Sequence, residues 1–281
     1  MKIKFTKMHG CGNDYIYINC FNQEIKNPSQ LSMELSYDRR KSIGGDGIIL
    51  IEPSETADAM MRIFNKDGSE GKMCGNGIRC VAKYLVDHNI SNRLQNIKID
   101  TKSGIKTLDV LENNGKEALV RVSMGKASLN PNDIPMIIEK EKVVNEAVTV
   151  GKETYNITCV SMGNPHCVLF VPEAYTANVK EVGPQLCNHT MFPEGVNVEF
   201  VSVVDKTNLM MRVWERGSGE TLACGSGACA SVVAAVENGY CEPNTEVTVH
   251  VRGGKLKVNY GKDEVFLIGN AVKVFEGEIE V

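Results

Sequence analysis

Several features are missing from this chain of 281 residues, and each absence argues against a class of function. No apolar run is long enough to cross a bilayer, and Met1 to Gly10 lacks the hydrophobic core of a signal peptide. Basic residues are not in excess, because 31 Lys and Arg stand against 35 Asp and Glu. The net charge of −4 argues against a broad nucleic-acid surface. We therefore expect a cytoplasmic protein without membrane or nucleic-acid partners.

Signatures of metal and cofactor binding are also missing. The ten cysteines include no Cys-x-x-Cys pair, and the spacings Cys74/Cys80 and Cys224/Cys229 fit no zinc motif. Residues 44–47 are glycine-rich but lack the lysine of a phosphate loop. No Gly-x-Gly-x-x-Gly follows a predicted strand with an acidic residue downstream. The sequence thus predicts neither a metal nor a cofactor.

What the chain does contain is one internal repeat. Residues 60–77 read MMRIFNKDGSEGKMCGNG, and 210–227 read MMRVWERGSGETLACGSG, with identical residues at seven of eighteen positions. A second match, at an offset of 151, pairs Gly12-Asn13 with Gly163-Asn164. Two copies are too few for a solenoid, so they favour two similar domains that face each other across a cleft.

Local patterns predict the fold class of each half. Short runs of β-branched and aromatic residues predict many strands, the last two over 263–268 and 271–275. Apolar spacing predicts one principal helix after Gly77 and one after Gly227, and residues 28–37 and 178–189 are also helix-like. We expect an α/β (α+β) protein with mostly antiparallel sheets or barrels around one helix per domain. Residues 125–140, which include two prolines, are predicted to be the linker.

Each predicted principal helix begins at a cysteine. The motifs are Cys74-Gly75-Asn76-Gly77 and Cys224-Gly225-Ser226-Gly227. A helix N-terminus has unpaired N–H groups and a partial positive charge, so it can lower a thiol pKa and bind a carboxylate. If the repeat places the two sites face to face, one thiolate can remove a proton from a carbon while the other thiol delivers one to the opposite side. The repeat therefore predicts stereochemical inversion by two cysteines.

These motifs resemble those of the diaminopimelate epimerase family. The resemblance covers both halves of the chain, in Lys7–Tyr15, Met73–Cys80, Gly163–His166, Gly195–Phe200 and Trp214–Ala230. It implies cofactor-independent interconversion of LL- and meso-2,6-diaminopimelate for lysine and peptidoglycan precursors, and a homodimer. It also implies that the last strand returns to the first domain, giving domains of 1–122 plus 270–281 and of 123–269.

The resemblance assigns roles to individual residues. Cys74 and Cys224 are the expected acid/base pair, and His166 and Glu215 are expected to support proton transfer. Arg216 can grip a distal carboxylate. The remaining expected substrate contacts are Asn13, Asn65, Gly75, Asn76, Asn164, Asn197, Glu215, Gly225 and Ser226. One departure is Gly47, where some family members have a glutamine, so one polar contact is expected to be missing or replaced.

Two other readings stay open from the residues alone. A racemase of another amino acid could use the same scaffold, although a long substrate fits Arg216 and the asparagines better. A non-catalytic protein could use the paired cysteines as a disulfide switch. Oxidation that abolishes turnover without creating a partner interaction would favour the enzyme. Because one cysteine must be thiolate and the other thiol, we expect a mildly alkaline pH optimum.

Overall fold

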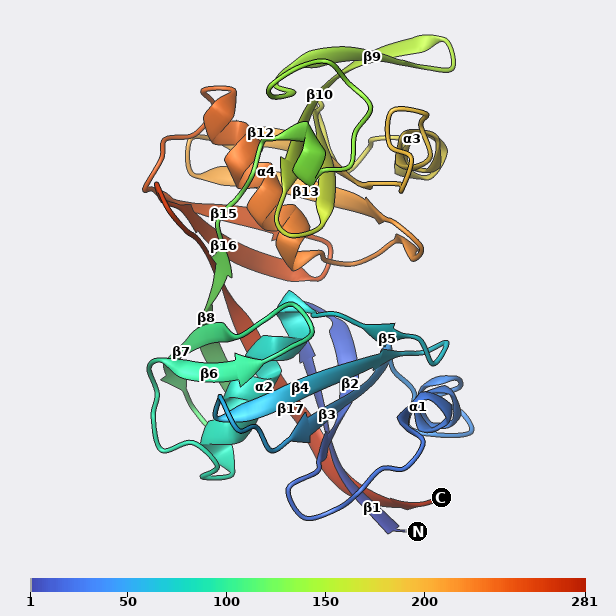
Figure 1. Ribbon diagram of the computed structural model, residues 1–281, viewed down its shortest axis with the longest axis vertical. Helices are drawn as coiled ribbons and strands as arrows, with labels where there is room; N and C mark the ends of the chain where they lie inside the picture. Colours follow the sequence, from blue (N-terminus) through green and yellow to red (C-terminus); the bar gives the residue numbers. More distant parts are fainter. Residues whose placement is uncertain (1) are drawn as a thin grey trace. The chain divides into compact units, whose positions relative to one another are not determined.

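The computed structural model describes residues 2–281, which divide into two compact units (Figure 1). The first unit contains the chain up to Ser123 together with Ile268–Val281, and the second contains Met124–Leu267. The chain leaves the first unit within strand β8 (Glu117–Gly125) and returns within strand β17 (Val265–Glu280).

The strands of the first unit form a closed ring. Antiparallel pairs are β1–β2, β3–β4, β6–β7, β7–β8 and β1–β17, parallel pairs are β2–β3 and β4–β6, and β8 also pairs with β17. The ring thus has eight strands and no open edge. The other elements of this unit are β1 (Lys2–Gly10), β2 (Asn13–Asn19), α1 (Pro28–Ser36), β3 (Gly47–Glu52), β4 (Ala59–Asn65), β5 (Glu70–Gly71), α2 (Gly75–Asp87), β6 (Ile97–Asp100) and β7 (Lys106–Asn113).

Helix α2 runs inside this ring. It packs against β1, β2, β6 and β7, and every residue from Asn76 to Leu85 is buried. Helix α1 instead packs on the outer side of β3 and β4, where Leu31 and Leu35 join a core cluster with Ile48 and Phe64. Cys74 lies directly before this buried helix, so the packing of α2 sets the position of the cysteine.

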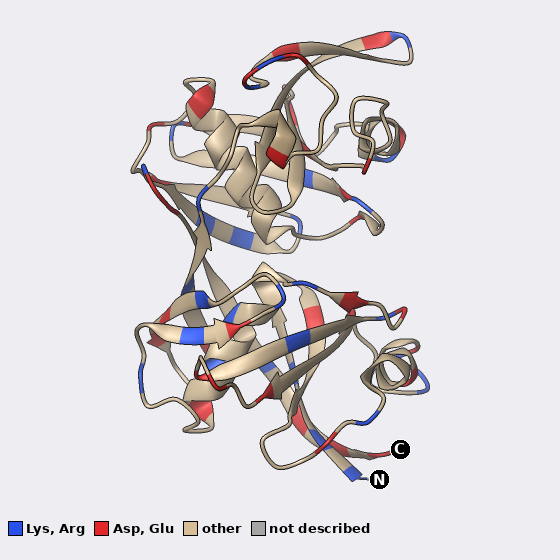
Figure 2. Ribbon diagram, viewed as in Figure 1, with Lys and Arg blue, Asp and Glu red and all other residues tan. Residues whose placement is uncertain are grey.

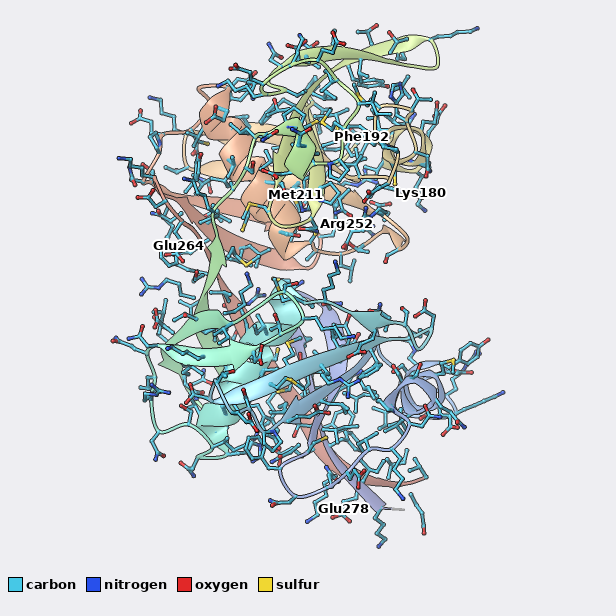
Figure 3. All side chains as sticks on the ribbon, in the orientation of Figure 1. Lys180, Phe192, Met211, Arg252, Glu264 and Glu278 are labelled. Atoms are coloured by element: carbon cyan, nitrogen blue, oxygen red, sulfur yellow. The ribbon has the colours of Figure 1, made fainter. Side chains whose placement is uncertain are left out.

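The second unit is built in the same order. Its strands pair in the sequence β9–β10–β11–β12–β13–β15–β16, with β11–β12 and β13–β15 parallel. Phe192 and Met211, labelled in Figure 3, are buried in this unit, whereas Lys180 is exposed. Its elements are η1 (Pro131–Asp133), β9 (Glu146–Val150), β10 (Glu153–Ser161), β11 (Pro165–Phe170), α3 (Val179–Cys187), β12 (Asn197–Asp205), β13 (Asn208–Glu215), β14 (Gly219–Glu220), α4 (Gly225–Glu237), β15 (Glu246–Val251) and β16 (Gly254–Tyr260).

The sequence repeat reappears in the strand registers. Ile48 pairs with Phe64 in β3–β4, and Val198 pairs with Trp214 in β12–β13, at the same offset of 150. The parallel pairs agree as well, because Ala59 opposite Ile99 in the first unit corresponds to Leu209 opposite Val249 in the second. Positions that match in the repeat are therefore structurally equivalent, and the predicted mixed α/β fold with two similar halves is confirmed.

Three local predictions need correction. The supposed linker is not a free connection, because Ile134 and Met136 belong to the core of the second unit. Strand β9 was not predicted, and the two predicted final strands are one strand, β17, in which Gly269-Asn270 stays in the ladder rather than forming a turn. Within residues 2–281, no helix is long and apolar enough to cross a membrane.

Candidate active site

Cys74 is the N-cap of α2. Its backbone is extended (φ −133°, ψ 117°), and its sulfur accepts a hydrogen bond from the N–H of Gly77 at 3.3 Å. The N–H groups of the first helical turn have no partner within the helix. The predicted geometry of the first motif is therefore present, with a half-buried thiol beside N–H donors.

Asn13 is a predicted residue that is hydrogen-bonded to this thiol. Cys74 Sγ donates to Asn13 Oδ1 at 3.2 Å, and Asn13 Nδ2 donates to Asp46 Oδ2 at 2.6 Å. Asp46 also accepts from the backbone N–H of Asp14 at 3.1 Å. Burial raises the pKa of Asp46, and the bond from Asn13 opposes this rise. The Asp46 carboxylate thus fixes the Asn13 amide with its oxygen turned towards Cys74.

Cys224 occupies the equivalent position in the second unit. It caps α4 with an extended backbone (φ −122°, ψ 116°), and its sulfur accepts from the N–H of Gly227 at 3.4 Å. Ser226 Oγ lies 3.5 Å from the sulfur. Unlike Cys74, this cysteine is buried, with 7% of its surface exposed. The two motifs therefore share a backbone arrangement but differ in their access to solvent.

The surroundings of Cys224 favour its protonated form. Burial raises the pKa of Cys224 well above its usual value, and the carboxylates of Glu215 and Glu199 add to this effect. The hydrogen bonds from Ser226 and Gly227 act in the opposite direction. Glu215 accepts hydrogen bonds from Thr221 and Cys224, while burial raises the pKa of the Glu215 carboxyl. A proton that leaves Cys224 therefore has a nearby acceptor in Glu215.

His166 is fully buried and lies within a hydrogen-bonded chain that begins at Glu199. Its Nδ1 lies 2.7 Å from Glu199 Oε1, and its Nε2 lies 3.2 Å from Asn164 Oδ1. Asn164 Nδ2 then donates to Ser226 Oγ at 3.2 Å. The chain links Glu199 to the residue beside Cys224, and it brings together three predicted residues.

Other predicted residues are held by backbone groups. Asn197 Nδ2 donates to the Pro165 carbonyl at 3.0 Å, and its oxygen accepts from the Arg216 N–H at 2.9 Å. The exposed Arg216 side chain donates to the carbonyls of Glu194 and Gly195 at 2.8 and 3.3 Å. These bonds tie Arg216 to β12 and to the turn before it.

Two positions singled out by the sequence, Asn65 and Gly47, lie opposite each other at the end of β4 and the start of β3. Asn65, the last residue of β4, donates to Ser69 Oγ at 3.0 Å. Its strand partner is Gly47, and a Cβ atom on Gly47 would lie 2.0 Å from the Phe64 carbonyl oxygen. A side chain at position 47 would therefore require the backbone to move.

Sequence reasoning missed two fully buried charges near the helix starts. Arg79 donates to the Gly75 carbonyl at 2.9 Å and to Asn76 Oδ1 at 2.8 Å, so the buried Asn76 side chain is held towards Arg79. Glu199 lies in a strand whose residues 197–202 are all buried. The available signal was a charged residue inside an otherwise apolar element, which is rarely buried without a functional partner.

Comparisons with known proteins agree with this geometry. The family model described as diaminopimelate epimerase matches residues 5–130 and 158–274. A protein named diaminopimelate epimerase from Acetivibrio thermocellus is 49% identical over 99% of both chains, and one from Methanococcus maripaludis is 46% identical over 99% of this chain and 100% of its own.

Solved structures show the same fold at low sequence identity. A phenazine biosynthesis protein from Bacillus anthracis has a TM-score of 0.71 at 17% identity, and each chain is fully covered. A hydroxyproline epimerase from Agrobacterium vitis has a TM-score of 0.67 at 14% identity, over 99% of this chain and 92% of that one. With the family model and the curated relatives in agreement along nearly its whole length, the chain belongs to the diaminopimelate epimerase family of isomerases.

Proposed function

We propose that this chain interconverts LL- and meso-2,6-diaminopimelate without a cofactor, using Cys74 and Cys224 as its two acid/base groups. The observation that carries the proposal is that both cysteines cap structurally equivalent helices within a repeat. The names of the relatives, which are 44–49% identical to this chain, support the choice of substrate. As an isomerase of this family the chain serves lysine biosynthesis.

The helix starts are suited to the carboxylate next to the reacting carbon. The backbone N–H groups of Gly75, Asn76, Gly225 and Ser226 lie in the first turns of α2 and α4. Such groups, together with the helix dipoles, attract a carboxylate. They also stabilise the extra negative charge that develops when the α-proton leaves.

Each turnover must begin with one of the two cysteines as a thiolate and the other as a thiol. The thiolate takes the proton from the α-carbon, which leaves a carbanion stabilised by the bound carboxylate. The thiol of the other cysteine then protonates the opposite face, so the enzyme ends with the two protonation states exchanged. Because the surroundings of Cys224 favour the thiol, Glu215 supplies the acceptor that Cys224 needs when it must act as the base.

Polar side chains outside the two motifs fit the far end of a long zwitterion. Arg216 offers a guanidinium for the distal carboxylate, and amides such as those of Asn65, Asn164 and Asn197 offer both donors and acceptors. We propose that these residues favour diaminopimelate over shorter amino acids. A racemase of a shorter amino acid would not need Arg216.

The proposal is tested by assaying the purified protein, dialysed against chelator, with LL-diaminopimelate and with a panel of L-amino acids. Chiral chromatography should show meso-diaminopimelate as the main product and far slower conversion of the panel. An Arg216→Gln variant should raise KM for diaminopimelate while leaving the slow panel reactions unchanged. Faster conversion of another amino acid would show that this amino acid, and not diaminopimelate, is the substrate.

We also propose a cytoplasmic homodimer, which the family resemblance supports. Sedimentation equilibrium of the purified protein should give about twice the chain mass of 30.8 kDa. A single species at the chain mass over a wide concentration range would contradict the dimer.

A further inference from the structure

The buried pair of Glu199 and His166 occurs in the second unit only. At the repeat offset of 150, Glu199 corresponds to Ile49, and at the upstream offset of 151, His166 corresponds to Tyr15. Both equivalents are buried. The packing confirms the correspondence, because a Cβ on Gly77 would lie 2.7 Å from Ile49 Cδ1, whereas one on Gly227 would lie 2.6 Å from Glu199 Oε1. The charge pair therefore has a local purpose that the shared fold does not require.

The Glu199 carboxylate is fully buried and only partly hydrogen-bonded. Its side chain has no solvent exposure, and Oε2 has no hydrogen-bond partner within the described chain. Among residues 2–281, no Lys or Arg forms an ion pair with it. A buried carboxylate in this position is stabilised chiefly by a neighbouring positive charge, and His166 at 2.7 Å is the group that can carry one.

The charged groups around His166 also favour a positive charge on its ring. Glu199 on β12 and Glu215 on β13 are carboxylates, and the latter is close enough to interact electrostatically with His166. Cys224 is a thiol whose pKa is raised well above the usual value by burial. The two carboxylates thus present negative charge to the imidazole.

The hydrogen-bond pattern leads to the same state. Asn164 Nδ2 donates to Ser226 Oγ, so its oxygen, Oδ1, is the atom that faces His166 Nε2 at 3.2 Å. A carbonyl oxygen only accepts, so Nε2 carries a hydrogen. When Glu199 is ionised its Oε1 also only accepts, so Nδ1 then carries a second hydrogen. A ring with both nitrogens protonated is an imidazolium. A neutral ring with its hydrogen on Nδ1 would instead turn the Asn164 amide around.

We propose that Glu199 is a positioning residue that holds His166 as an imidazolium and thereby fixes the Asn164 amide with its NH2 group turned towards Ser226 and the start of α4. In the first unit, the equivalent Asn13 is held by an acceptor, Asp46, and turns its oxygen towards Cys74. The two asparagines are therefore oriented oppositely, and an NH2 donor beside Ser226 suits a substrate carboxylate. The binding of a substrate carboxylate by this amide rests on the proposed function, whereas the protonation state of His166 does not.

The direct test is ¹⁵N NMR of protein labelled at its five histidines, with the His166 signals assigned by their loss in His166→Gln. At pH 7.5, both ring nitrogens of His166 should show the chemical shifts of an imidazolium. In Glu199→Gln, His166 should become a neutral tautomer at the same pH. The matched control is Glu237→Gln, on the last turn of α4 and paired with Lys142, which should change nothing.

A neutral His166 in the wild-type protein would overturn the proposal, and this measurement needs no variant to fold. An imidazolium that persists in Glu199→Gln would overturn the role of Glu199. Kinetically, Glu199→Gln should raise KM about tenfold or more with a smaller change in kcat, because the amide contacts the substrate in its ground and transition states alike. If the His166 chemical shifts are as expected in both proteins but no diaminopimelate is epimerised, the proposed function fails while the positioning role stands.

Discussion

At the scale of single residues, the two cysteines share a backbone and differ in their surroundings. Cys74 is half-buried and donates to an amide oxygen, whereas Cys224 is buried among carboxylates. A two-base mechanism needs one group ionised and the other protonated. Burial and charge near Cys224 are a physical reason for that thiol to stay protonated, which the symmetric motifs alone do not contain.

Replacing either cysteine should nearly abolish turnover. Cys74→Ser and Cys224→Ser keep an N-cap oxygen, so the helices should remain intact while the acid/base group is lost. We expect kcat to fall by about 10²–10⁴-fold in each variant. Cys241→Ser, which alters a buried cysteine outside both motifs, serves as the control and should retain activity. Full activity in either catalytic variant would exclude two cysteine bases.

The pH dependence should reflect the carboxylate beside Cys224. Glu215 raises the pKa of Cys224, so its removal lowers that pKa and ionises the thiol at lower pH. In Glu215→Gln, the alkaline limb of the kcat/KM profile should therefore move to lower pH by about one unit. The profile should be recorded from both isomers. An alkaline limb that stays in place or moves upwards would show that Glu215 does not act on Cys224.

The sequence predicted most of the residues near the cysteines but not the charges behind them. The resemblance to the diaminopimelate epimerase family identified His166 and Glu215, and the repeat, which pairs Asn164 with Asn13, supported the choice of Asn164. Glu199 could not be recognised in the same way. In a strand buried on both faces, periodicity does not separate inward from outward positions, so its burial becomes visible only when α4 packs against it.

At the scale of elements, the helix starts are packed differently in the two units. A Cβ on Gly77 would meet the flexible end of Ile49, whereas one on Gly227 would meet the Glu199 carboxylate and lie 3.3 Å from Cys224 Sγ. A side-chain end in an apolar core can yield by rotation. The Glu199 carboxylate is held by His166 and cannot.

Gly227→Ala should therefore be more damaging than Gly77→Ala. We expect Gly227→Ala to lower the free energy of unfolding by about 1–3 kcal/mol, at the cost typical of overpacking. It should also reduce kcat by displacing Cys224. Gly77→Ala should be milder on both counts, as measured by urea unfolding and steady-state kinetics. Equal effects in the two variants would mean that Glu199 is free to move.

The elements that carry the repeat were predictable, and those that only complete the units were not. The principal helices α2 and α4 have clear apolar spacing and glycine signals at their starts. Strand β9 has only five residues, of which Val148 and Val150 are buried, so its apolar alternation covers too few positions to stand out in the sequence. In β17, Gly269-Asn270 has the composition of a turn, but pairing with neighbouring strands overrides this local preference.

At the scale of the whole molecule, the features of interest are the distribution of charged residues and the path of the chain between the units. Acidic and basic residues are interspersed over both units in Figure 2, and α4 carries no charged residue until Glu237 in its last turn. Strand β17 starts in the second unit and ends in the first, where it closes the ring by pairing with β1 and β8. The integrity of the first unit thus depends on the last residues of the chain.

Truncation should reveal this dependence. A chain ending at Tyr260 lacks β17, so its first unit should fail to fold cooperatively. A chain ending at Gly277 loses only the pairs of Lys2, Ile3 and Lys4 with residues 280, 279 and 278, and its Tm should fall by a few degrees, at about 2–4 °C per kcal/mol. Differential scanning calorimetry distinguishes the two. Cooperative unfolding of the shorter chain would show that the ring closes without β17.

The central claim is that two cysteines exchange a proton at one α-carbon without a cofactor. Proton NMR of fully reduced protein with LL-diaminopimelate in heavy water tests it directly. The account predicts that the meso product forms with deuterium at the inverted α-carbon, because the incoming proton derives from a thiol that exchanges with solvent. Meso product that retains the original α-proton from the start, or no product from reduced protein, would contradict the two-base mechanism.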